Sequence, residues 1–172
     1  PKFAFTLTET NPAATLTPSK VDGAVTLTAG SAVFHDGDTG TAQAGGSSTI
    51  TLKSGALATD DIYNGATVRI TGGTGNGQTR IISDYVGSSK VATVSSAWTT
   101  QPDATSTYTV SSVVGQYCEN TNNFGRARIV SFTSTTVVEA QVEIPFFNTS
   151  SISSGNWVLE SGYEDAWSTY KG

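Results

Sequence analysis

The chain has 172 residues, a formal net charge of −5 and one cysteine, Cys118. Charged residues make up 13% of it, about half the share in an average soluble protein, so the polar surface must consist mainly of Ser, Thr, Asn, Gln and Gly. This composition argues against nucleic acid as a partner and excludes an intramolecular disulfide and a Cys-based zinc site. No apolar run approaches the roughly 20 residues of a membrane span, and the lone cysteine favours a reducing compartment.

Short alternating segments predict an all-β fold. Five segments alternate apolar and polar side chains: residues 3–8, 24–28, 48–52, 66–71 and 137–144. A period of two places one face in a core and the other in water. Turn residues separate these segments: Asp22-Gly23, Asn64-Gly65, Gly72-Gly73 and Asn123-Phe124-Gly125. Short strands at regular turn spacing are typical of small β-barrels or sandwiches.

An internal repeat indicates two similar modules. Residues 77–83 resemble residues 125–131, and each copy continues through an aromatic residue into a Val-rich strand. The opening strands at 24–28 and 49–53 also match. Self-similarity of this kind is the mark of a repeated structural unit.

The order of the repeated pieces predicts that one module is inserted in a loop of the other. We expect an N-terminal arm at 1–20, an outer module at 21–44 plus 111–160, an inserted module at 45–110 and a C-terminal tail at 161–172. The Gly/Ser/Ala-rich stretch 40–48 is the expected joint, because insertions are best tolerated at loop tips. The alternative is one larger β domain whose Thr/Val strands resemble each other by composition alone.

Residues that suggest catalysis or metal binding have simpler interpretations. The segment 72–79 is close to a phosphate-binding loop, but Gln78 stands where that loop needs Lys and no helix follows, so a hairpin is expected. His35 with Asp36 and Asp38 suggests a weak cation site, although a solvated turn is favoured. The acidic pairs Asp60-Asp61 and Glu164-Asp165 are expected in solvated turns. We therefore assign no catalytic, cofactor-binding or metal-binding residue.

Aromatic side chains supply the candidate binding residues. Tyr63, Tyr85 and Trp98 are candidates for stacking on a glycan, with core packing as the alternative. Tyr163, Trp167 and Tyr170 follow the last predicted strand and are candidates for docking on a protein partner.

The span 47–110 resembles a small β module found in many virion proteins of tailed bacteriophages. The matching residues are Asp61, Tyr63, Gly65, Gly75, Gly77, Gln78, Arg80, Ile82, Asp84, Tyr85, Trp98, Pro102, Asp103, Ser106 and Tyr108. The outer module resembles repeats of tail-tube and nozzle-type proteins, through residues 23–29, 32–34, 114–115, 125–129, 135–138 and 155–157 and through Ala166-Trp167-Ser168. The resemblance covers about residues 20–168.

This resemblance implies a structural role without catalytic residues. We expect a non-enzymatic component of a phage particle, either a tail accessory, a fibre-base or a capsid decoration protein. It would be assembled in the host cytoplasm and would dock onto other virion proteins as a homo-oligomer on the particle, with residues 1–20 and 160–172 as candidate docking arms. The alternative is a carbohydrate-binding module that recognises a host surface glycan. No cofactor, nucleic acid or membrane is expected as a partner.

Overall fold

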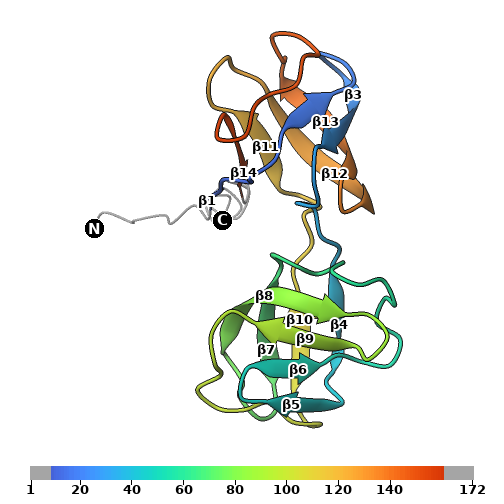
Figure 1. Ribbon diagram of the computed structural model, residues 1–172, viewed down its shortest axis with the longest axis vertical. Coiled ribbons are helices and arrows are strands. Elements are labelled where there is room, and N and C mark those ends of the chain that lie inside the picture. Colours follow the sequence, from blue (N-terminus) through green and yellow to red (C-terminus); the bar gives the residue numbers. More distant parts are fainter. Residues whose placement is uncertain (1–8, 161–172) are drawn as a thin grey trace, which may run out of the picture. The chain divides into compact units, whose positions relative to one another are not determined.

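The computed structural model describes residues 9–160, and these residues form fourteen β-strands and no helix (Figure 1). The strands make two separate seven-stranded antiparallel sheets. The prediction of an all-β chain is therefore confirmed. Among the described residues, no helix is long and apolar enough to cross a membrane.

The two sheets belong to two compact units, one inserted in the other. Of the described residues, unit 1 comprises 9–33 and 114–160, and unit 2 comprises Phe34–Val113. The predicted insertion is confirmed, but its boundaries move. Residues 34–44 lie in unit 2 because strand β4 (Asp38–Thr41) pairs with β10 (Thr107–Val110). The stretch 40–48 is consequently part of the unit 2 sheet and is not the joint.

The unit 1 sheet has the strand order β1-β14-β11-β12-β13-β3-β2. Its strands are β1 (Glu9–Thr10), β2 (Leu16–Pro18), β3 (Ala24–Ala29), β11 (Tyr117–Asn120), β12 (Arg126–Ser134), β13 (Val137–Ile144) and β14 (Trp157–Glu160). Strand β1 pairs with β14 and β2 pairs with β3. The segment from β1 to β2 is thus part of the unit 1 sheet, which contradicts its assignment to a separate N-terminal arm.

The unit 2 sheet has the strand order β4-β10-β7-β8-β9-β6-β5. Its other strands are β5 (Ala44–Gly46), β6 (Thr49–Thr51), β7 (Thr67–Gly72), β8 (Thr79–Val86) and β9 (Val91–Val94). In each unit the first strand pairs with the last, and the second and third strands form a hairpin at the opposite edge. The two units therefore share one topology, which is the structural basis of the sequence repeat.

The pairing registers define which residues of the two units are equivalent. Both units carry a β-bulge at the same place, after Ile82 in β8 and after Ile129 in β12. Ile82 is thus the equivalent of Ile129, whereas the sequence repeat aligned Ile81 with Ile129. The correction matters because a shift of one residue moves a strand's side chains to the opposite face of the sheet.

Each sheet curves around its own core. Fully buried side chains include Leu16, Leu27 and Trp157 in unit 1 and Ile50, Ile70 and Tyr108 in unit 2. A single sheet can enclose such side chains only by curling, since among the described residues no helix covers it. Backbone hydrogen bonds assist closure in unit 1, where Leu16 and Ile152 exchange bonds of 2.9 and 2.7 Å.

Candidate functional site

The glycine-rich segment 72–79 forms the hairpin between β7 and β8, as predicted. The Gln78 amide nitrogen donates to the carbonyl oxygens of Gly75 (3.0 Å) and Thr100 (2.8 Å). Its amide oxygen accepts from the N–H groups of Thr99 (2.7 Å) and Thr100 (3.0 Å). Gln78 therefore ties this hairpin to the loop between β9 and β10.

Arg80 and Trp98 also hold the β9–β10 loop in place. The Arg80 Nε and Nη2 atoms donate to the Ala97 carbonyl oxygen at 3.0 and 2.8 Å. The guanidinium carbon lies 5.4 Å from the centroid of the Trp98 ring. The Trp98 indole nitrogen donates to the Thr49 carbonyl oxygen at 3.1 Å. Arg80 and Trp98 thus stabilise the fold of unit 2.

The three candidate glycan residues Tyr63, Tyr85 and Trp98 are buried in unit 2. The Tyr63 and Tyr85 rings meet edge to face with centroids 4.7 Å apart. The Tyr85 hydroxyl donates to the Leu57 carbonyl oxygen at 2.7 Å, and burial raises the pKa of Tyr85 to about 12. Stacking on a sugar requires an exposed ring face. The structure therefore contradicts the assignment of these three residues as a stacking platform.

The region around His35 is a buried polar network, which contradicts the expectation of a solvated turn. His35 is buried, and its Nδ1 donates to the Ser111 carbonyl oxygen at 3.1 Å. Loss of solvation lowers the pKa of His35. Asp38 accepts a 2.6 Å hydrogen bond from the Tyr108 hydroxyl and forms a 2.5 Å ion pair with Lys53. Within residues 9–160 no cluster of three or more His, Cys, Asp or Glu side chains is arranged to hold a metal ion.

The remaining predicted residues divide between ordered turns and the undescribed tail. The Asp60 carboxylate accepts a hydrogen bond from the Gly87 N–H at 2.7 Å, and Asp61 accepts one from the Asn64 side chain at 2.7 Å. These two acids therefore shape a turn in unit 2. The pair Glu164-Asp165 and the candidate docking residues Tyr163, Trp167 and Tyr170 lie outside the described residues.

One end of unit 1 exposes large apolar side chains. Phe124, in the turn between β11 and β12, is 82% exposed, and Phe147, in the loop after β13, is 76% exposed. Ile144 is 47% exposed. These residues share an end of the sheet because β12 and β13 pair there, with Arg126 opposite Ile144. We call Phe124, Ile144 and Phe147 the phenylalanine end.

The backbone of the phenylalanine end is fixed by local contacts. The Asn120 side-chain oxygen accepts hydrogen bonds from the N–H groups of Asn122 (3.0 Å) and Asn123 (3.2 Å). A Cβ atom at Gly125 would lie 2.4 Å from a ring carbon of the buried Phe146, so the turn requires glycine there. Phe124 has a φ of 59°, a conformation that bulky residues adopt only at an energetic cost.

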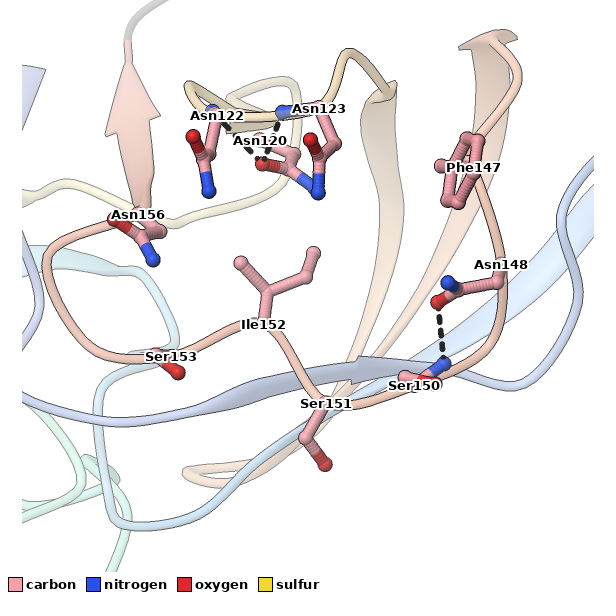
Figure 2. Close-up of a pocket in the computed structure, with 10 residues that line it drawn as sticks. All are labelled: Asn120, Asn122, Asn123, Phe147, Asn148, Ser150, Ser151, Ile152, Ser153 and Asn156. Atoms are coloured by element: carbon pink, nitrogen blue, oxygen red, sulfur yellow. Dashed lines mark hydrogen bonds between the residues drawn. The ribbon is translucent and has the colours of Figure 1, made fainter.

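Beside this end lies a pocket of about 210 Å³ (Figure 2). Its walls come from the β11–β12 turn and the β13–β14 loop, and they consist of Asn120, Asn122, Asn123, Phe147, Asn148, Ser150, Ser151, Ile152, Ser153 and Asn156. None of these side chains is charged. A second hollow of about 160 Å³ shares Asn120 and Asn122 and is also lined by Phe124, Ile144 and the charged residues Glu119 and Arg126. The end of unit 1 thus combines exposed rings, a pocket of neutral hydrogen-bonding groups, and an ion pair between Arg126 and Glu119 at 3.6 Å.

Sequence reasoning treated Asn123-Phe124-Gly125 only as a turn and missed this site. The available signal was an aromatic residue inside a glycine turn, where no strand face can bury it. No protein-family model, curated protein or solved structure matches the chain.

Proposed function

We propose that this chain is a non-enzymatic structural component of a tailed-phage particle that docks onto another virion protein through the phenylalanine end. The observation that carries the proposal is the exposure of Phe124 (82%) and Phe147 (76%) at one end of unit 1, with Phe124 on a turn whose backbone is held by the Asn120 side chain. Burial of one such side chain against a partner is worth roughly 1.5–3 kcal/mol. A pair of exposed rings at one end therefore supplies a contact of useful strength.

The surroundings of the phenylalanine end suit burial in a protein contact. The pocket beside Phe147 is lined by amide and hydroxyl side chains together with Phe147 and Ile152, and none of them is charged. In the hollow beside Phe124, the charged side chains of Glu119 and Arg126 form an ion pair at 3.6 Å. Moving amide and hydroxyl groups out of water costs less free energy than moving ions. Symmetry of the particle would also combine many weak contacts into firm attachment, which fits a homo-oligomeric arrangement on the virion.

The resemblance of both modules to tailed-phage proteins supports the assignment to a virion. Gln78, Arg80 and Trp98 carry that resemblance, and they serve the fold of unit 2. Because these three side chains stabilise the fold, we assign specific binding to a different surface, the phenylalanine end. The predicted docking residues Tyr163, Trp167 and Tyr170 are a second contact within the same proposal, and deletion of residues 161–172 tests that contact separately.

The test is attachment of purified protein to particles that lack it, measured by co-sedimentation. The double variant Phe124→Ser/Phe147→Ser should lose attachment, because removal of about 3 kcal/mol or more weakens each contact at least about 100-fold. The matched control is Ile81→Thr/Val86→Thr, which removes two exposed apolar side chains from unit 2. Unchanged circular dichroism establishes that both variants fold. Attachment of the phenylalanine variant at the wild-type stoichiometry would refute docking through this end.

A further inference from the structure

Unit 1 has a polar residue, Asn120, at a position where unit 2 has a buried apolar residue, Ile70. Asn120 pairs with Trp157 in unit 1, and Ile70 pairs with Tyr108 at the equivalent place in unit 2. Ile70 is fully buried, and Asn120 is only 8% exposed. An amide in so buried a position is costly unless its polar groups are hydrogen-bonded.

The hydrogen bonds of Asn120 leave one side of its amide without a partner. Its oxygen accepts the two backbone bonds that shape the turn. Its nitrogen carries two N–H donors and makes no hydrogen bond with any residue in the described range. Asn120 lines the pocket of unit 1, so these donors are available to a molecule bound there.

The corresponding place in unit 2 is closed by a side chain. Ile70 N–H donates to the Gln78 carbonyl oxygen at 2.9 Å, and Asn120 N–H donates to that of Gly125 at 2.8 Å, so Gln78 and Gly125 are equivalent. The Gln78 side chain bridges the two loops at its end of unit 2. Gly125 has no side chain to form such a bridge. In unit 1 the two loops instead form the walls of the pocket, as Figure 2 shows.

The lining groups of this pocket indicate the class of ligand. The side-chain amides of Asn122, Asn123 and Asn156 make no hydrogen bond within the described part of the chain. Each amide offers both donors and an acceptor, which suits hydroxyl groups that also donate and accept. The absence of charged side chains from the lining disfavours phosphate, carboxylate and Ca²⁺ as ligands.

Phe147 adds an apolar surface beside these amides. Its ring is 76% exposed and forms part of the pocket wall. The volume of about 210 Å³ lies below the roughly 300–1,000 Å³ of sites for drug-sized ligands, so it suits a single small ring. An extended peptide would instead be recognised by pairing at a strand edge, whereas loops form this pocket. We propose that the pocket binds one neutral sugar residue, with the Asn120, Asn122 and Asn156 amides as hydrogen-bonding groups and Phe147 as the ring contact.

The proposal goes beyond docking onto the particle and does not depend on it. Its test is an NMR titration of the full chain, labelled with ¹⁵N, with methyl hexopyranosides and N-acetylglucosamine. Saturable shifts are expected for the side-chain amides of Asn120, Asn122 and Asn156, with a dissociation constant on the order of 1 mM for a single sugar. Inorganic phosphate and N-acetylglycine methylamide serve as charged and peptide-like probes, and neither should shift these signals.

Matched variants make the assignment specific. Asn156→Ala should weaken sugar binding about 3- to 10-fold, the loss expected for one net hydrogen bond. Asn76→Ala, in the β7–β8 loop of unit 2, should leave binding unchanged. Absence of a saturable shift with any sugar, equal shifts with the peptide probe, or an unaffected Asn156→Ala variant would overturn the proposal. Asn156 is not part of the phenylalanine end, so this variant should still attach to particles if docking is correct.

Discussion

Replacement of Gln78 by alanine should destabilise unit 2 by about 2 kcal/mol. The side chain makes four hydrogen bonds, two through its nitrogen and two through its oxygen. One such bond contributes roughly 0.5–1.5 kcal/mol net. Three of the four bonds lie in exposed surroundings, so we take the lower end of that range. For a unit of this size, the change corresponds to a fall in Tm of about 10 °C.

Urea and thermal unfolding of the full chain, followed by circular dichroism and tryptophan fluorescence, measure this loss. The matched control is Gln101→Ala, because the Gln101 side chain makes one hydrogen bond, a 2.8 Å contact with the Gly45 carbonyl oxygen. The control should lose only about 0.5 kcal/mol. If Gln78→Ala costs no more than Gln101→Ala, the bridge between the two loops does not stabilise unit 2 and the reasoning is wrong.

Three further predictions concern single side chains. Burial lowers the pKa of His35 below the value of about 6.5 expected in the unfolded chain. The stabilisation from neutral His35 is therefore complete above about pH 6.5 and is lost as the pH falls through the folded pKa, by at most about 1.4 kcal/mol per pH unit. Urea midpoints measured down to about pH 5 should fall for the wild type and stay flatter for His35→Gln; equal slopes would contradict this. Burial raises the pKa of the Cys118 thiol, so a thiol reagent should not label the native protein. Unit 2 has valine, Val68, at the position equivalent to Cys118, so Cys118→Val should reduce the stability by less than about 1.5 kcal/mol. Rapid labelling of the folded chain would refute that placement. Phe124→Gly should raise the stability of unit 1 by about 1 kcal/mol, because glycine adopts a φ of 59° without strain and Phe124 is exposed. The same substitution should weaken attachment to particles. A loss of stability would contradict the first expectation.

The all-β fold was predictable because its signals are local, and the insertion was predictable from the order of the repeated segments along the chain. Alternation over segments such as 24–28 and 137–144 fixes which face of a strand is buried, and glycine turns mark the strand ends. The module boundary was not predictable, because Asp38 belongs to unit 2 through its pairing with Val110. The repeat register was also missed, since a β-bulge after Ile129 leaves no distinctive residue type in the sequence.

The candidate site was predictable only in part. Aromatic residues were rightly treated as either binding or core residues, but composition does not reveal exposure, and Tyr63 is buried whereas Phe147 is not. The pocket of unit 1 was not visible either, because its walls come from residues 120–123 and 147–156, which meet only once β11, β12 and β13 pair. Comparison with unit 2 shows why unit 1 has a pocket there: the Gln78 side chain bridges the equivalent loops of unit 2, and unit 1 has Gly125 at that position.

The most direct test of docking through the phenylalanine end is hydrogen exchange of the chain, measured free and bound to particles. Bound protein should show slower exchange in the β11–β12 turn, residues 120–125, and around Ile144 and Phe147, because a partner would exclude water from these amides. Protection confined to unit 2, with unchanged exchange at the β11–β12 turn, would contradict the proposal.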